Sequence, residues 1–257
     1  MLKVTAPGGA GEILLHACCA PCSGAILECL RDSGIRPVVF FSNSNIFPKG
    51  EYDLRLAELR RYAALMGVEL VEDAYDHDAW LAAVRGLEAE PERGRRCAAC
   101  FRFRLARAAR YAASLGLPVL ATTLASSRWK DLDQVAEAGQ SACSALPLQR
   151  SKVAPLQNFA LRAHPSQPDG WAPPVYEATG GHGFAGENLA AASRQFERSA
   201  AADSTSRAVA GEDQVVVFWP QNWRKGGLQE RRGEIVREQG FYNQNWCGCE
   251  FSKPQTL

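Results

Sequence analysis

The sequence predicts an α/β protein in which helices flank a mostly parallel sheet. Short apolar runs rich in β-branched and aromatic residues alternate with segments whose apolar residues recur at helical spacing. Glycines follow several of the helical segments as stop signals. The connections between the strand segments are long enough for helical crossovers, and strand–helix alternation of this kind builds βαβ units.

The first half of the chain begins with a strand and a helix. The apolar run Glu12–Ala17 is typical of a short buried strand, and a helix is expected after it over 23–31. Pro37–Ser42 is rich in β-branched and aromatic residues, whereas 51–66 has apolar residues at helical spacing before Gly67. The remaining expected elements are a strand over 68–71, a helix over 78–85, a helix over 101–115 that ends at Gly116, and a strand over 118–123.

The regular pattern is interrupted in the second half. Residues 147–213 are rich in proline, glycine and alanine and keep no clean period. We predict that they form a flexible insertion within a single domain over 1–257, rather than a second packed domain. A strand over 214–219 and a helix over 228–238, ended by Gly240, are expected after it.

Composition and charge bound the class of protein. The 257 residues suit one large domain, and 46% hydrophobic and 22% charged residues are ordinary for a globular protein with a buried core. A net charge of +1 gives no global attraction for nucleic acid, so any RNA contact needs a local basic patch. The first residues lack the apolar region of a signal peptide, and no apolar run approaches the roughly 20 residues of a membrane span. We therefore expect a cytoplasmic protein with no membrane partner and with its cysteines reduced.

Seven of the nine cysteines fall in three tight clusters that are far apart in the sequence. Cys18, Cys19 and Cys22 follow the first expected strand, at the sheet edge where open α/β proteins bind ligands. The unpaired N–H groups and the positive dipole end of the next helix lower thiol pKa values at such a place. The plain alternative is that these cysteines fill a tight turn as small hydrophobic side chains.

Cys97 and Cys100 form a C-x-x-C pair just before the helix expected over 101–115. Two sulfurs at this spacing can bind zinc, ligate an iron–sulfur cluster or form a disulfide. With Cys18 and Cys19 they make four sulfurs, which is the ligand set of structural zinc or of a [4Fe–4S] cluster. A structural zinc more often holds a small loop-rich unit, so ligands at the edge of a sheet favour a functional cluster.

The third cluster, Cys247-Gly248-Cys249, is too tightly spaced to wrap one metal. It suits a strained, reducible disulfide that carries two electrons, and the alternative is a pair of idle thiols. The other two cysteines, Cys29 and Cys143, are expected to serve packing. We expect His16 to be buried rather than liganding, and Asp131 to cap a helix.

Basic residues mark two candidate substrate-binding segments. Arginines gather around the second cysteine cluster, where Arg95 and Arg96 directly precede Cys97. They could hold the phosphates of an RNA backbone, although a solvated helix face has the same composition. Arg224 and Lys225 lie among aromatic residues that could stack on a base or could belong to the core.

Six stretches of the chain together match one known family. They are Leu14–Ser23, Phe41–Pro48 with Glu51, Tyr52 and Arg55, Glu90–Phe101 with Arg104 and Leu105, Thr122–Leu124 with Ser127, Lys130 and Asp131, Trp223–Gly227, and Tyr242–Ser252. In this combination the chain resembles the QueH-type epoxyqueuosine reductases. The resemblance extends from about residue 11 to residue 252, apart from the insertion.

The resemblance implies a fold, a reaction and a set of cofactors. The fold is a sheet related to the adenine-nucleotide α-hydrolase (HUP, PP-loop-like) fold, with cysteines in place of the phosphate-binding first loop. The reaction is reduction of epoxyqueuosine to queuosine at the wobble position of tRNA, the last step of queuosine biosynthesis, without cobalamin and with an external electron donor. The implied centres are a [4Fe–4S] cluster on Cys18, Cys19, Cys97 and Cys100, a redox-active Cys247–Cys249 disulfide, and an additional mononuclear iron for which Cys22 is the candidate ligand.

The chain departs from the family pattern in three places. It carries the insertion, it has Trp129 where proline or histidine is usual, and it has Trp246 where tyrosine is common. The cysteine clusters also leave two other functions open. A tRNA-thiolating enzyme of the same fold should keep a glycine-rich ATP loop, which the first cysteine cluster replaces. A zinc-stapled RNA-binding module without catalysis is the alternative that is not an enzyme.

Overall fold

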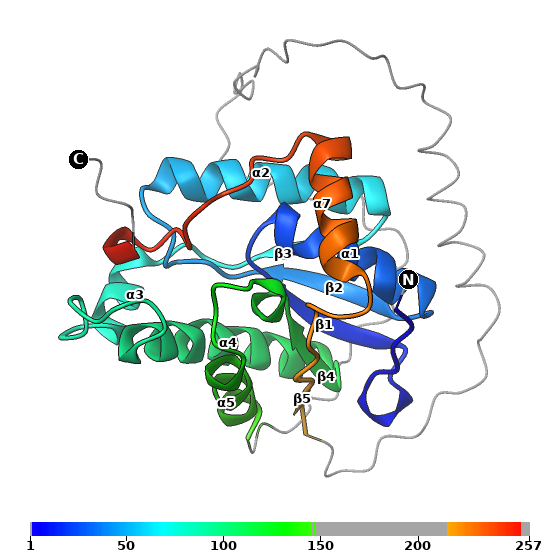
Figure 1. The fold of residues 1–257 in the computed structure, drawn as a ribbon. Coiled ribbons are helices and arrows are strands. Elements are labelled where there is room, and N and C mark those ends of the chain that lie inside the picture. The colour runs from blue at the N-terminus through cyan, green and yellow to red at the C-terminus, as the bar shows by residue number, and fades with distance from the viewer. Residues whose placement is uncertain (1, 145, 147–214, 253–257) are drawn as a thin grey trace, which may run out of the picture.

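The computed structural model describes residues 2–144, 146 and 215–252, and five parallel strands form one sheet within them. In spatial order the strands are β3 (Glu69–Glu72), β2 (Arg36–Phe41), β1 (Glu12–Ala17), β4 (Val119–Thr122) and β5 (Val217–Phe218) (Figure 1). The expected α/β class with a parallel sheet is confirmed. The predicted insertion over 147–213 lies outside the described residues.

Helices cover both faces of the sheet. They are α1 (Ala20–Asp32), α2 (Lys49–Met66), α3 (His77–Ala83), α4 (Arg95–Leu115), α5 (Leu132–Cys143) and α7 (Leu228–Gln239), with short 3₁₀ turns at Pro7–Gly9, Thr123–Ser126 and Glu250–Ser252. One apolar cluster joins Ile13 and Leu15 of β1 to α1, α2 and α7, and a second joins Leu14 to α4 and α5. Because successive side chains of a strand point to opposite faces, β1 supplies both cores.

The strand order reverses beside β1. The connection from β1 to β2 runs to one side of β1, and β4 pairs on its other side, with Leu14 opposite Leu120 and His16 opposite Thr122. An open α/β sheet has its ligand crevice at such a switch point, beyond the carboxyl ends of the two strands. The fold therefore places the candidate site next to the residues that follow Ala17 and Thr122.

Most element boundaries agree with the sequence-based expectation, and β1 agrees at both ends. The expectation for α4 was wrong by six residues, because the helix begins at Arg95 rather than at 101. Cys97 and Cys100 consequently lie in its first turns and not before it. A helix that starts here also places the two cysteines, three residues apart, on the same face.

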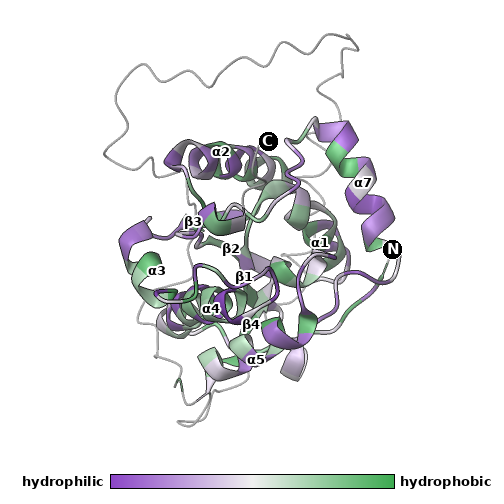
Figure 2. Ribbon diagram, turned by 60° about the vertical axis from the view of Figure 1, so that its left-hand side comes forward, coloured by the Kyte–Doolittle hydropathy of each residue, from purple (hydrophilic) through white to green (hydrophobic). Residues whose placement is uncertain are grey.

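Helix α7 buries few of its side chains. Helix α7 is mostly hydrophilic (Figure 2), and only Leu228 and Ile235 of it are buried. Ile235 packs over Gly24 of α1, where a Cβ added at Gly24 would lie 3.0 Å from the Cγ2 atom of Ile235.

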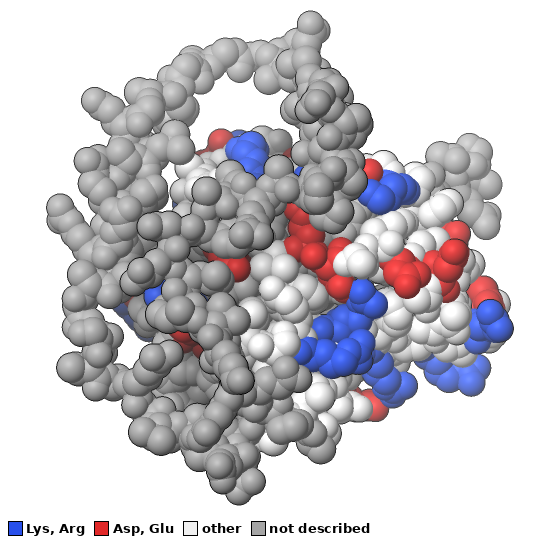
Figure 3. Space-filling model, turned by 180° about the vertical axis from the view of Figure 1, so that it is seen from behind, with Lys and Arg blue, Asp and Glu red and all other residues white. Residues whose placement is uncertain are grey.

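On the face seen from behind, basic and acidic side chains lie near one another (Figure 3), as suits a chain with a net charge of +1. Among the residues that the structure describes, no helix has the length and hydropathy to span a membrane.

Helix α5 packs against β5 at Gly139, and this contact predicts a measurable effect. A Cβ at Gly139 would overlap the ring of Phe218, whereas a Cβ at Gly233 of α7 meets only the far end of Arg237, 3.7 Å away. We expect Gly139→Ala to lower the free energy of unfolding by about 1–3 kcal/mol, since the core must be overpacked. Gly233→Ala, the matched control, should raise it by about 0.5–1 kcal/mol through helix propensity. Urea unfolding followed by circular dichroism measures both, and a stabilised Gly139→Ala variant would contradict the packing.

Candidate functional site

A cavity of about 830 Å³ lies beyond the carboxyl ends of β1 and β4. Its lining includes seven of the nine cysteines of the chain, namely Cys18, Cys19, Cys22, Cys97, Cys100, Cys247 and Cys249. The three clusters, which lie far apart in the sequence, thus share one cavity. Cys29 and Cys143, which were expected to serve packing, are buried in the two sheet cores.

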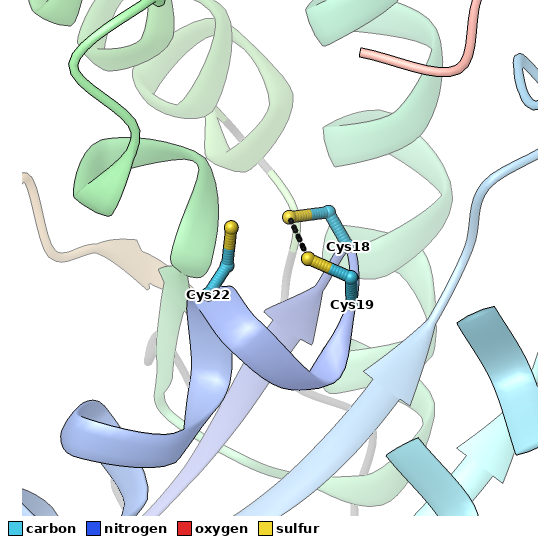
Figure 4. A group of neighbouring side chains, drawn as sticks. All are labelled: Cys18, Cys19 and Cys22. Atoms are coloured by element: carbon cyan, nitrogen blue, oxygen red, sulfur yellow. Dashed lines mark hydrogen bonds between the residues drawn. The ribbon is translucent and has the colours of Figure 1, made fainter. Parts of the chain in front are cut away.

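The turn from β1 into α1 holds the first cluster. Cys19 is the extended residue that precedes α1, and Cys22 lies in the first turn of that helix. The Sγ atoms of Cys18 and Cys19 are 3.8 Å apart, and the three sulfurs all lie within 4.8 Å of one another (Figure 4). Three convergent thiols at this distance could bind a metal ion.

The three thiols of the first cluster differ in their pKa values. Hydrogen bonds from the thiols of Cys19 and Cys22 hold the pKa of Cys18 well below its ordinary value, and the nearby Arg104 guanidinium lowers it further. The same hydrogen bonds raise the pKa of Cys19, and that of Cys22 to about 11. Cys18 is therefore the most acidic thiol of the triad, and the triad can release protons when a cation binds.

Residues of β4 and its following turn support the first cluster. The backbone N–H of Cys18 donates to the Oγ1 atom of Thr123 at 3.1 Å, and that hydroxyl lies 3.4 Å from the Cys18 sulfur. His16 lies beneath, fully buried, with its ring nitrogens 2.8 Å from the Thr122 hydroxyl and 3.2 Å from the Ser42 carbonyl oxygen. Burial lowers the pKa of His16 to about 3. The prediction that this histidine is buried is confirmed.

Helix α4 brings the second cluster to the cavity. The backbone N–H of Arg93 donates to the Cys97 sulfur at 3.3 Å, and burial raises the pKa of the Cys97 thiol. The loop before α4 is held by Arg96, whose guanidinium is buried and donates to the backbone carbonyls of Glu88 and Glu90. Arg96 therefore shapes the cysteine-bearing turn from within the protein.

The third cluster is docked against the loop that follows β2. The carbonyl of Gly248 accepts from the backbone N–H of Phe47 at 2.9 Å, and that of Cys247 accepts from Arg55 at 3.1 Å. Gly248 has a φ of +97°, and a Cβ there would lie 3.0 Å from Ile46, so the tight turn between the two cysteines requires glycine. Both cysteines are free thiols in the structure.

Cys247 and Cys249 differ in acidity. A hydrogen bond from Cys249, the charge of Lys130 and the hydroxyl of Ser252, 2.9 Å away, hold the pKa of Cys247 well below its ordinary value. The same hydrogen bond and burial raise the pKa of Cys249. Cys247 is therefore the more acidic member of the pair, and the more acidic thiol of a dithiol is the one that reacts first as a nucleophile.

Basic side chains outnumber acidic ones around the cavity. Its lining includes seven basic residues, Arg55, Arg93, Arg96, Arg104, Arg128, Lys130 and Arg232, against the acidic Glu92, Asp131 and Glu230. Burial by itself would lower the pKa of Lys130, but the facing Cys247, Cys18 and Cys100 raise it above its ordinary value. Arg104 is buried and donates to the Ser42 carbonyl and the Asn43 side chain, which are both neutral. The lining therefore provides compensating positive charge for an anionic occupant.

The structure separates the four predicted substrate-binding residues. Arg96 lines the cavity, whereas Arg95, Arg224 and Lys225 lie outside the lining. The Arg224 guanidinium instead holds the loop after the Thr123–Ser126 turn through the backbone carbonyls of Ser127 and Lys130. Sequence reasoning gave no role to Lys130, and it grouped Arg104 only with the arginines that could hold RNA phosphates. The position of Lys130 shortly after β4, at the switch point of the sheet, is the signal that could have indicated it. Asp131 caps α5 as expected, accepting from the N–H groups of Asp133 and Gln134.

The acidity of Cys247 predicts a weaker pH dependence of its alkylation rate than that of an ordinary thiol. An ordinary thiol reacts about a hundredfold more slowly with iodoacetamide at pH 6 than at pH 8, because the thiolate is the nucleophile. We expect the Cys247 rate to fall by a clearly smaller factor over this range, because its lowered pKa leaves more of the thiol ionised at pH 6. Cys143, whose pKa burial raises to about 12, should remain unmodified. Mass spectrometry of the labelled peptides measures both rates, and a Cys247 rate that falls tenfold per pH unit would refute the lowered pKa.

Comparison with known proteins gives a consistent result. The profile of a family described as "Epoxyqueuosine reductase QueH" matches residues 13–154 and 188–255. A relative of that name from Histophilus somni is 32% identical over 254 residues, which cover 99% of this chain and 77% of the relative. Relatives of the same name from Haemophilus influenzae and Acinetobacter baylyi are each 31% identical, covering 97% and 99% of this chain and 75% and 86% of their own lengths.

Proposed function

The chain belongs to the QueH family of epoxyqueuosine reductases, and on that premise we propose that it reduces the epoxide of epoxyqueuosine in tRNA to queuosine, the last step of queuosine biosynthesis. The observation that carries the proposal is the cavity at the switch point of the sheet, where seven cysteines converge. Almost nothing else in the chain offers redox chemistry. The function is that of an oxidoreductase.

The stoichiometry of the reaction matches the chemistry of the third cluster. Removing the epoxide oxygen breaks two C–O bonds, forms one C=C bond and releases water, which consumes two electrons and two protons. Oxidation of Cys247 and Cys249 to a disulfide releases the same two electrons and two protons. An external electron donor, which is part of the proposal, then reduces the disulfide for the next turnover.

The donor set of the cavity fits an iron–sulfur cluster. Four thiolate ligands are required, and Cys18 and Cys19 from the β1–α1 turn and Cys97 and Cys100 from α4 line the same cavity. In the proposal these four hold a [4Fe–4S] cluster, and Cys22 is left for an additional mononuclear iron. When bound, the cluster supplies a one-electron carrier and a Lewis-acidic iron. The buried Arg104 and the half-buried Lys130 would offset the negative charge of such a group.

Two residues of this chain have proposed roles beside the cysteines. Lys130 is an ammonium group among Cys18, Cys100 and Cys247, so it can donate a proton to the leaving oxygen while it stabilises the Cys247 thiolate. The Ser252 hydroxyl lies 2.9 Å from the Cys247 sulfur, and in the proposal it holds that sulfur in position. The proposal includes a reducing cytosolic setting, which suits nine free thiols.

The test is reduction of the natural substrate by the reconstituted protein. Anaerobically purified protein, loaded with iron and sulfide and supplied with a reductant, is incubated with tRNA that contains epoxyqueuosine, and the nucleosides are separated by liquid chromatography and identified by mass. Queuosine formation supports the proposal. Protein with an intact cluster that forms no queuosine refutes it. Protein that instead retains stoichiometric zinc and binds tRNA without turnover would establish the zinc-stapled module.

A further inference from the structure

Trp129 is a large apolar side chain that this fold leaves in solvent at the rim of the cysteine cavity. It is 59% exposed, the highest value among the large hydrophobic residues that the structure describes. It also belongs to the cavity lining, between Arg128 and Lys130. A single exposed apolar side chain is ordinary by itself, and it is the place of Trp129 in the cavity lining that makes it a candidate for contact with a ligand.

The backbone that carries Trp129 is held in place from two sides. The Arg93 guanidinium donates to the carbonyl oxygens of Trp129, at 3.1 Å, and Arg128, at 3.2 Å. The Arg224 guanidinium donates to the carbonyl of Lys130 at 2.6 Å and also to that of Ser127. Two arginines thus fix a loop of four residues through its carbonyl groups. The exposure of the indole is therefore a property of a pre-organised loop, and such loops suit recognition because little ordering is needed on binding.

The surroundings of the indole have the chemistry of a site for single-stranded RNA. The Cζ atom of Arg128 lies 5.0 Å from the centroid of the Trp129 ring. Stacking platforms for unpaired bases combine an aromatic face with arginine and with a positively charged path for the backbone. The excess of basic over acidic groups in the cavity lining supplies that charge. The net charge of +1 of the whole chain shows that this excess is local.

The size of the cavity determines which part of an RNA would reach Trp129. A volume of about 830 Å³ is within the range that accommodates one small-molecule-sized ligand. A nucleoside that enters to meet the cysteines therefore leaves the nucleotides on either side of it at the rim. A base at the rim of this cavity comes within reach of the exposed indole.

We propose that Trp129 is a stacking platform for the unpaired base that adjoins the nucleoside under reduction. This inference rests on the proposed function, because it takes tRNA as the substrate. It assigns Trp129 to binding of the RNA strand and to no step of the chemistry. Trp129 acts on the affinity for tRNA, while the cysteines and Lys130 act on the turnover rate.

Steady-state kinetics with two variants test the platform. Trp129→Ala should raise KM for epoxyqueuosine-containing tRNA roughly five- to a hundredfold, the range expected for one base–aromatic stack, with kcat unchanged within about twofold. Trp129→Phe should recover most of the affinity. Leu54→Ala, the control, removes an exposed apolar side chain of α2 outside the cavity lining and should leave KM unchanged. A KM for Trp129→Ala equal to that of the wild type overturns the inference.

Abasic substrates identify the base. Anticodon stem-loops that lack the base on the 5′ or on the 3′ side of the modified nucleotide are compared for wild type and Trp129→Ala. One of the two abasic stem-loops should weaken binding to the wild type and abolish the difference between the two proteins, because the same stack is removed from either side. A difference that persists with both stem-loops shows that Trp129 contacts no flanking base. Failure of the proposed function is a separate outcome, since the wild type then forms no queuosine from any substrate.

Discussion

Replacing Cys249 by serine is expected to lower multiple-turnover reduction by about a hundredfold or more, because a single remaining thiol cannot carry two electrons as a disulfide. The variant should keep its iron, since neither Cys247 nor Cys249 belongs to the proposed ligand set. It should also keep its fold, because the hydroxyl replaces a sulfur that lies at the cavity wall. Queuosine formed per enzyme molecule, in the presence of a continuous electron donor, is the measurement.

The matched control for this variant is Cys143→Ala. Cys143 is also buried, but it lies in the core between the sheet, α4 and α5, outside the cavity. We expect full turnover from Cys143→Ala and a modest loss of stability, because a small buried side chain is shortened. Full multiple-turnover activity of Cys249→Ser would remove the dithiol from the mechanism and leave the cluster as the sole redox centre.

Loss of the cluster is the expected result when a cysteine of α4 is replaced. In the proposal, Cys97→Ser and Cys100→Ser each remove one of four ligands, so the visible charge-transfer absorbance and the acid-labile sulfide should both disappear. Cys22→Ser should keep both. If the additional mononuclear iron is bound through Cys22, the wild type contains more iron than sulfide, and Cys22→Ser contains equal amounts.

The same series can reveal a different ligand set. The three sulfurs that the structure holds within 4.8 Å of one another include Cys22 and neither cysteine of α4. If the cluster is lost in Cys22→Ser but kept in Cys97→Ser, then Cys22 is a ligand and Cys97 is not. That result would contradict the ligand set that the resemblance implies. Metal analysis and the absorbance spectrum decide between the two sets without an activity assay, so the result stands apart from the reductase test.

Local patterns in the sequence suffice for the α/β class and for most of the strands of the parallel sheet. β1 and β2 are predictable because buried strands of a parallel sheet are short apolar runs. The common position of Cys18 and Thr123 follows from the topology, since the carboxyl ends of neighbouring parallel strands share one edge. The start of α4 was missed because Gly94 and the preceding proline-containing segment are typical of a turn, while its first turns depend on contacts such as those of Arg96.

The roles of the charged residues could not be predicted from local patterns. Arg96 and Arg224 lie in segments whose basic composition is typical of a phosphate-binding surface. Both nevertheless donate to backbone carbonyls of loops around the cavity. Whether Lys130 lies in solvent or in the cavity depends on how the loop before α5 is held. Tertiary contacts hold that loop, so a local pattern cannot predict the position of Lys130. Whether a long side chain binds a ligand or the protein itself is decided by neighbours far away in the sequence.

The order of the three clusters along the chain matters for how the protein is made. A ribosome synthesises the residues around Cys18, Cys19 and Cys22 first, then Cys97 and Cys100, and the dithiol of Cys247 and Cys249 near the end. Five of the seven cavity cysteines are therefore made while the dithiol does not yet exist, and α7, which completes one of the sheet cores, is also made late. If the proposed ligands bind a metal before synthesis is complete, the dithiol is not yet present to compete for it.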